Sequence, residues 1–150
     1  MKLLVPPPLI CVLAIVLTYA SKLLFPATRV DLPLLPNIGL AIAALGLLLA
    51  LIAVPGFVSR KTTVNPHKPE KTSALVTDGV YAFTRNPMYL ALVLIAAGAA
   101  LMQAAPLGLA FALLAGWYIT EFQIKPEEAA LRDIFGDEFE TYSKRVRRWI

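Results

Sequence analysis

The first group of residues that could act in catalysis or ligand binding consists of three polar residues beside one proline. Arg85, Asn86 and Tyr89 lie in one short stretch, with Pro87 between them. Proline is favoured at the first position of a helix, so we expect a helix to begin here with its free backbone amides close to a guanidinium and a phenol. Such groups bind a carboxylate or a ribose. The alternative is an interfacial anchor, in which aromatic rings and an arginine contact lipid headgroups.

Two adjacent carboxylates form a second group. Glu127 and Glu128 directly follow Pro126, where a helix can begin. We predict that one of the two contacts a cationic or amino-bearing cofactor, and the alternative is that both only complement the helix dipole. Glu121 precedes them near the end of an apolar stretch. An acid within the membrane is a functional candidate, although its shallow depth also lets it reach headgroup water.

The remaining reactive residue types give weaker indications of function than these two groups. Cys11 is the only cysteine, so an internal disulfide is excluded, and we expect it to be a small apolar residue. His67 is the only histidine and is expected to be a solvated loop residue rather than a base. No cluster of cysteine and histidine indicates a metal site. The basic run that ends in Arg147, Arg148 and Trp149 predicts either contact with anionic lipid or a cap on the membrane surface.

The composition requires a membrane around these residues. Hydrophobic residues make up 58% of the 150 and charged residues 16%, against about a quarter charged in soluble domains. The net charge of +4 is therefore read as an orientation signal and a lipid contact, not as a sign of nucleic-acid binding.

Uncharged stretches predict an all-α integral membrane protein with four transmembrane helices in a single domain. The predicted spans are 7–25, 37–57, 88–104 and 108–123, since about 20 apolar residues cross a bilayer. The third and fourth should form a helical hairpin, because Pro106 and Gly108 interrupt a 35-residue uncharged stretch. A signal peptide is the alternative for the first span.

Two polar segments complete the prediction. Residues 58–87 should form a loop, because Pro66 and Pro69 oppose a regular helix. Residues 126–147 carry apolar side chains at three- and four-residue spacing and predict a C-terminal amphipathic helix, which Gly136 weakens midway. Glycines such as Gly39 and Gly46 should let helices pack closely.

The distribution of bases predicts the orientation. Twelve of the 14 lysines and arginines lie at the chain ends or in the central loop, and only Lys22 and Arg29 lie near the other membrane face. The positive-inside rule then places both termini and the candidate site in the cytoplasm, in an inner or plasma membrane.

Five segments in this order resemble the isoprenylcysteine carboxyl methyltransferase and phospholipid methyltransferase superfamily of integral membrane enzymes. They are residues 62–69, 75–81, 84–90, 126–128 and 135–142. The resemblance implies an S-adenosylmethionine-dependent methyltransferase that acts on a lipid or lipidated acceptor at the cytoplasmic membrane face. The acceptor group would be a carboxylate or an amine, and it would arrive from the bilayer.

The resemblance also implies roles for individual residues. Arg85, Tyr89 and Glu128 would be catalytic. The cofactor would be held by a larger set, namely Gly79, Tyr81, Arg85, Asn86, Pro87, Tyr89, Glu127 and Glu128. Tyr142 and Arg145 would close over the pocket and bind substrate.

Two positions depart from the superfamily pattern. Asn86 stands where histidine is common, so it can form hydrogen bonds but cannot act as a general base. Ala91 stands where glycine is common, which narrows the helix surface beside the cofactor. Two other functions remain open from the residues alone: an NADPH-dependent membrane reductase of related topology and a four-helix transporter. The acceptor and the oligomeric state are not predicted.

Overall fold

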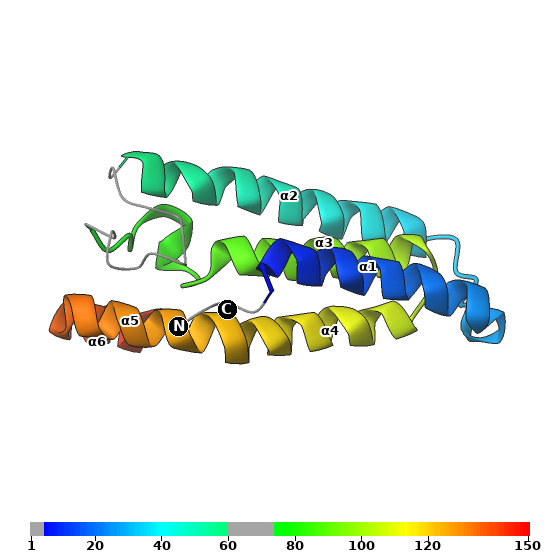
Figure 1. Ribbon diagram of the computed structural model, residues 1–150. Helices are drawn as coiled ribbons and strands as arrows, with labels where there is room; N and C mark the ends of the chain where they lie inside the picture. The colour runs from blue at the N-terminus through cyan, green and yellow to red at the C-terminus, as the bar shows by residue number, and fades with distance from the viewer. Residues whose placement is uncertain (1–4, 60–73) are drawn as a thin grey trace.

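The computed structural model describes the backbone of residues 5–59 and 74–150 and the side chains of residues 5–54 and 74–150. Every regular element in these ranges is a helix, which confirms the all-α class. The four long helices are α1 (Pro7–Leu24), α2 (Leu35–Ser59), α3 (Pro87–Met102) and α4 (Leu107–Ile119) (Figure 1). His67, the segment 62–69 and, more widely, residues 60–73 of the predicted loop 58–87 lie outside the described residues.

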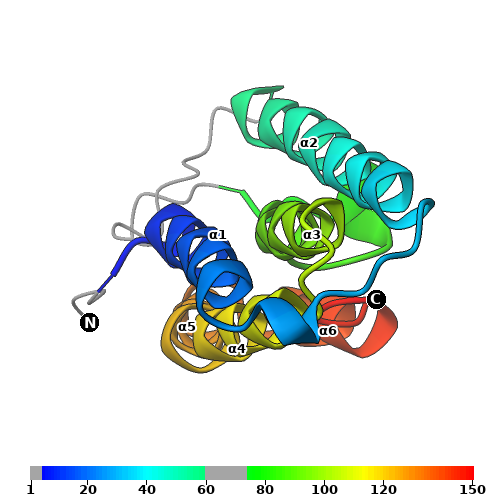
Figure 2. The same cartoon turned by 90° about the vertical axis from the view of Figure 1, so that its right-hand side faces the viewer.

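Helix α3 lies at the centre of the bundle. It contacts α1, α2 and α4, and the view along the bundle shows it between them (Figure 2). Glycines make the approach to α2 close, as predicted. A Cβ on Gly39 would lie 2.5 Å from Met102 N, and one on Gly46 would lie 2.8 Å from Ala91 O. The backbones of α2 and α3 are therefore in direct contact, which holds α3 and the polar segment before it in place.

The outer faces of α1 and α2 are apolar and exposed. Leu9 and Leu13 of α1 are 56% and 52% exposed, and Leu47 and Leu51 of α2 are 56% and 63% exposed. Within residues 5–59 and 74–150, three helical stretches are long and apolar enough to cross a membrane: Pro7–Leu24, Leu35–Val54 and Leu107–Phe135. Helix α3 is shorter, at 16 residues, or about 24 Å at 1.5 Å per residue.

Helix α4 does not end before the acidic pair. It passes through a π-turn, η4 (Thr120–Ile124), directly into α5 (Lys125–Phe135). Pro126 therefore lies inside a continuous helix, and the expected break before Glu127 is absent. Proline has no N–H to donate to the carbonyl four residues earlier, and its ring would clash with that carbonyl. The wider π-turn just before Pro126 accommodates both effects.

The predicted C-terminal helix 126–147 is divided in two. Helix α5 ends at Phe135, and α6 (Asp137–Arg145) begins after Gly136, whose φ is 49°. A positive φ is accessible to glycine without the strain that a Cβ causes. The chain therefore turns at Gly136, and Phe139 and Tyr142 of α6, with Val146 just after it, pack against α5 and Leu75.

These elements bring the polar segments to one end of the bundle. The short helix η3 (Gly79–Ala82), the start of α3, helices α5 and α6 and the C-terminal segment 146–150 all lie there (Figure 1). The opposite end carries η1 (Pro26–Thr28) and the tight α3–α4 turn, in which Ala104 has a φ of 52°.

Candidate active site

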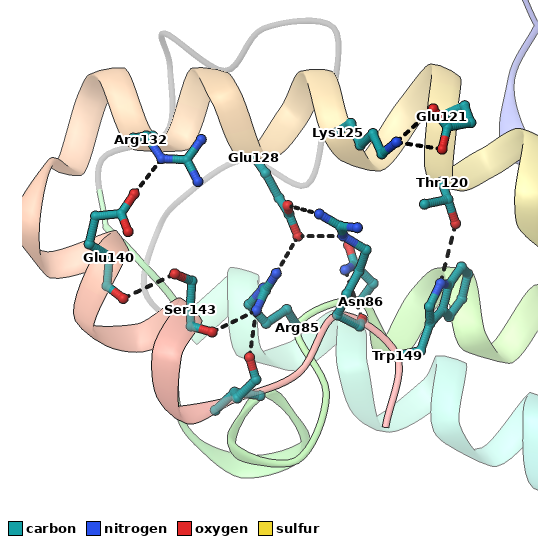
Figure 3. A network of polar contacts seen from close by, with 12 residues as sticks. Arg85, Asn86, Thr120, Glu121, Lys125, Glu128, Arg132, Glu140, Ser143 and Trp149 are labelled. Atoms are coloured by element: carbon teal, nitrogen blue, oxygen red, sulfur yellow. Dashed lines mark hydrogen bonds and ion pairs between the residues drawn. The ribbon is translucent and has the colours of Figure 1, made fainter.

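The Glu128 carboxylate lies between two arginines. Arg85 Nη2 donates to Glu128 Oε1 at 2.7 Å, and Arg148 donates from Nε to Oε1 at 3.1 Å and from Nη2 to Oε2 at 2.7 Å. The side chains of Glu128 and Arg85 are only 10% and 11% exposed. Figure 3 shows Glu128 reaching from α5 toward Arg85. Both of its oxygens are therefore occupied by charged donors.

Arg85 also holds the end of α6. Its Nη1 donates to the carbonyls of Ser143 at 2.9 Å and Val146 at 2.5 Å (Figure 3). Carbonyls at a helix C-terminus have no partner within the helix, and a cation there is favoured by the helix dipole. One guanidinium thus joins the start of α3, helix α5 and the end of α6. Its Nε is buried and has no hydrogen-bond partner among the described residues.

The neighbouring acid has different partners. Tyr89 OH donates to Glu127 Oε2 at 2.9 Å, and Gln123 Nε2 lies 3.5 Å from the same oxygen. Both donors are neutral, and in the described part of the chain Glu127 forms no ion pair. Glu127 thus has no charged partner among the described residues, and its Oε1 accepts no hydrogen bond from any of them.

The C-terminal segment 146–150 crosses both groups of residues. Arg85 N donates to Arg147 O at 3.0 Å, and Asn86 Nδ2 donates to Arg148 O at 3.0 Å. Further along, Trp149 Nε1 donates to Thr120 Oγ1 at 3.2 Å (Figure 3). Asn86 therefore acts as a hydrogen-bond donor that holds the C-terminal segment in place. This role does not require a titratable side chain.

The other predicted site residues lie around this centre. Pro87 opens α3 as expected, and Gly79 has a φ of 58° at the start of η3. Tyr142 OH donates to Tyr81 O at 2.7 Å, and Tyr81 OH to Ala53 O at 3.5 Å. Burial raises the pKa of Tyr142 to about 12, so it is a neutral donor at ordinary pH.

Arg145 and Glu121, two further candidates, form no ion pair or hydrogen bond with Glu127 or Glu128 among the described residues. Arg145 is exposed on α6. Glu121 forms an ion pair with Lys125, one helical turn away, with Nζ–Oε1 and Nζ–Oε2 distances of 2.5 and 2.8 Å (Figure 3). The structure therefore gives Glu121 a surface partner rather than a place beside Glu127 and Glu128.

Two residues of the centre were missed from the sequence. Arg148 pairs with the Glu128 carboxylate, 20 residues earlier in the chain. A run of basic residues does not indicate which of them forms an ion pair inside the protein. Gln123 is an amide near the end of an apolar stretch, a position without a distinctive signal. Within the described ranges, no group of three or more His, Cys, Asp or Glu side chains could hold a metal ion.

Comparisons with known proteins identify the family. The sequence profile described as phospholipid methyltransferase matches residues 35–138. The chain belongs to this family. This confirms the resemblance noted from the sequence, and the matched range contains Arg85, Tyr89, Glu127 and Glu128.

Named relatives and a solved structure agree with that assignment. A probable protein-S-isoprenylcysteine O-methyltransferase of Oryza sativa subsp. indica is 31% identical over 84% of this chain and 65% of its own length. The Schizosaccharomyces pombe enzyme is 35% identical over 53% of this chain and 34% of its own length. A structure of the eukaryotic intramembrane Ras methyltransferase, isoprenylcysteine carboxyl methyltransferase, has a TM-score of 0.75 and 30% identity, and the match covers 95% of this chain and 50% of that one.

The chain thus spans less than two thirds of the length of these relatives. Its apolar helices and its family together make it an integral membrane protein. The profile match over residues 35–138 includes α3 and α5, the helices that carry the two groups of polar residues.

Proposed function

We propose that this protein is an S-adenosylmethionine-dependent methyltransferase that acts on a lipid or lipidated acceptor at the cytoplasmic membrane face. The relatives are named for an isoprenylcysteine carboxyl group, and the family for phospholipid. One observation supports the proposal most. The Arg85–Tyr89 segment of α3 meets the Glu127–Glu128 pair of α5 through contacts of 2.7 and 2.9 Å, in a chain of that family.

The residues present fit this methyl donor. It carries an ammonium, a sulfonium and a carboxylate. Glu127, which has no cationic partner among the described residues, offers its carboxyl oxygens to the cationic groups, and the buried Arg85 Nε offers a donor for the carboxylate. When bound, S-adenosylmethionine would supply an activated methyl group. The protein's main task is then to align the reacting groups, which requires little acid–base chemistry.

We infer different roles for the two acids from their contacts. Glu128 is neutralised by Arg85 and Arg148, so it positions Arg85 and the C-terminal segment. Glu127 has only neutral donors and remains able to bind a cation. We therefore assign the direct cofactor contact to Glu127 and a positioning role to Glu128.

Calorimetric titration of purified protein with S-adenosylmethionine, and separately with NADPH, tests the proposal. Micromolar binding of S-adenosylmethionine without NADPH binding is expected. Glu127→Gln should weaken that binding at least tenfold, or by about 1.4 kcal/mol. Glu138→Gln is the matched control, because Glu138 is an exposed acid of α6. Binding of NADPH alone would indicate a reductase, and binding of neither by folded protein would overturn the proposal.

A further inference from the structure

The C-terminal segment 146–150 follows α6 without regular secondary structure and lies against the candidate active site. Val146 is its only buried side chain, at 3% exposure, and Ile150 at the other end is 78% exposed. Beyond Val146 the segment is held mainly by hydrogen bonds. Segments with few buried apolar contacts open at a lower free energy than the core of a fold. Residues 147–150 can therefore separate from the bundle without opening its core.

Arg148 ties this segment to two helices. Its Nε and Nη2 donate to the two oxygens of Glu128 on α5, at 3.1 and 2.7 Å, which makes the ion pair bidentate. Its backbone carbonyl accepts a hydrogen bond from Asn86 Nδ2 at 3.0 Å, directly before α3. The Arg148 side chain is 34% exposed, against 10% for Glu128. Water therefore reaches the Arg148 side of this ion pair.

Arg85 contacts the same carboxylate through one nitrogen only. Its Nη2 donates to Glu128 Oε1 at 2.7 Å, and its Nη1 already donates to the carbonyls of Ser143 and Val146. Its Nε is buried and has no hydrogen-bond partner among the described residues. Arginine and carboxylate often form two parallel hydrogen bonds, and Nε and Nη2 are the two nitrogens that Arg85 has left for such a pair. Arg148 occupies Oε2, the oxygen that would accept the second bond.

We propose that Glu128 exchanges its bidentate partner and that this exchange opens and closes the C-terminal segment over the site. In the closed state, which is the one described above, Arg148 forms the bidentate pair. In the open state Arg85 forms it through Nε and Nη2, and residues 147–150 leave the site. The bond gained by Arg85 Nε offsets part of what is lost with Arg148, and water replaces the other contacts of the segment. The two states therefore differ in few interactions.

A bound carboxylate would favour the closed state, an expectation that rests on the proposed function. Arg85 Nε pairs with Glu128 in the open state and lacks a described partner in the closed state. A carboxylate that enters while the segment is open takes over Nε from Glu128, which returns Glu128 to Arg148. A ligand that binds one of two states more tightly shifts the equilibrium toward that state. Ligands with the carboxylate of S-adenosylmethionine should therefore dissociate slowly, and Arg148 should set that rate.

Trp149 reports the position of the segment without any ligand. Its Nε1 donates to Thr120 Oγ1 at 3.2 Å (Figure 3). Trp117 is the other tryptophan and is exposed on α4, so Trp117→Phe leaves Trp149 as the only one. In this background, Arg148→Met should raise the acrylamide quenching constant of Trp149 at least threefold. Arg147→Met is the matched control, because the neighbouring Arg147 side chain is exposed and forms no ion pair with a described residue. Equal quenching in the two variants would overturn the proposal.

The exchange of partners has a separate test. Arg148→Met leaves Glu128 free to form a bidentate pair with Arg85, so its Tm should fall by less than half as much as that of Glu128→Gln, which leaves both arginines unpaired. An equal fall would show that Arg85 does not replace Arg148. Arg148→Lys keeps the charge but cannot form the bidentate pair. Its Trp149 quenching should lie between those of the wild type and Arg148→Met, and it tests the proposal if the methionine variant does not fold.

Addition of S-adenosylmethionine separates failure of the inference from failure of the function. Saturating S-adenosylmethionine should lower Trp149 quenching at least twofold, and its decarboxylated analogue should not. In stopped flow, S-adenosylmethionine should dissociate at least tenfold faster from Arg148→Met than from Arg147→Met. If it binds but leaves both variants at the same rate, the proposed function stands and the exchange at Glu128 is wrong. If the free variants differ in quenching as expected but S-adenosylmethionine does not bind, the exchange stands and the methyltransferase proposal is wrong.

Discussion

Adjacent residues of one helix can have unlike roles because successive side chains point about 100° apart. Glu128 points toward Arg85 and Arg148 and is neutralised by them, whereas Glu127 points toward Tyr89 and Gln123. The first environment is that of a structural ion pair. The second leaves the Glu127 carboxyl group with neutral donors only, which is the arrangement expected of a ligand-binding acid.

Removal of the Glu128 charge should destabilise the fold. Glu128→Gln leaves Arg85 and Arg148 without their counter-ion, and breaking a buried ion pair costs about 3 kcal/mol. Thermal unfolding in detergent should show a clear fall in Tm, with the control Glu138→Gln unchanged. Glu127→Gln breaks no ion pair between described residues, so its Tm should fall less than that of Glu128→Gln. A larger loss of Tm in Glu127→Gln than in Glu128→Gln would contradict this division of roles.

At the scale of elements, α6 is fixed by a buried phenol. Tyr142 OH donates to Tyr81 O, and burial raises the Tyr142 pKa from its ordinary value to about 12. In the unfolded chain a tyrosine titrates near 10. Between these two values the folded state binds more protons than the unfolded state, so stability falls as pH rises through this window and is unaffected below it.

Tyr142→Phe should reduce that alkaline loss. The variant loses a neutral hydrogen bond worth about 1 kcal/mol at pH 8. Between pH 10 and 12, where the raised Tyr142 pKa acts, its stability should fall less steeply than that of the wild type. Urea unfolding of both proteins at pH 8 and pH 11 measures the difference. Parallel pH dependence in the two proteins would show that the Tyr142 phenol is not the titrating group.

The π-turn lets α4 continue into α5 past Pro126. It absorbs one extra residue, so deleting Phe122 should restore α-helical spacing and leave the face of α5 nearly unchanged. Pro126 would then lie in a regular α-helix, where its ring clashes with the carbonyl four residues earlier at a cost of about 3 kcal/mol. We expect the deletion variant to unfold at a lower Tm than the wild type, and Pro126→Ala in the same variant to restore the Tm. An unchanged Tm in the deletion variant would mean that the π-turn does not accommodate Pro126.

At the scale of the whole molecule, the sequence predicted the bundle well and the contacts at its end poorly. The four apolar segments agree with helices α1 to α4 to within a few residues, because long uncharged stretches leave few alternatives to a helix. Pro126 was misinterpreted as a helix start, since proline marks a boundary unless a π-turn precedes it. Arg148 and Gln123 were missed because their partners depend on how α5, α6 and the C-terminal segment fold back, which a local pattern does not encode.

The orientation of the protein in the membrane is predicted from the distribution of its basic residues. Twelve of the 14 lysines and arginines fall at the chain ends or in the central loop, so the positive-inside rule places the site end of the bundle in the cytoplasm. Cys11 is buried and is the only native thiol. Single cysteines introduced as Thr28→Cys and Glu138→Cys in a Cys11→Ser background should therefore report the two faces separately.

A membrane-impermeant maleimide applied to intact cells should label the cysteine at position 28 and leave that at position 138 unlabelled until the membrane is opened. Both positions are exposed, at opposite ends of the bundle. The reverse pattern would place the acidic pair and the C-terminal segment outside the cell. S-adenosylmethionine is made and kept in the cytoplasm, so that result would also remove the methyl donor from reach of Glu127 and Arg85.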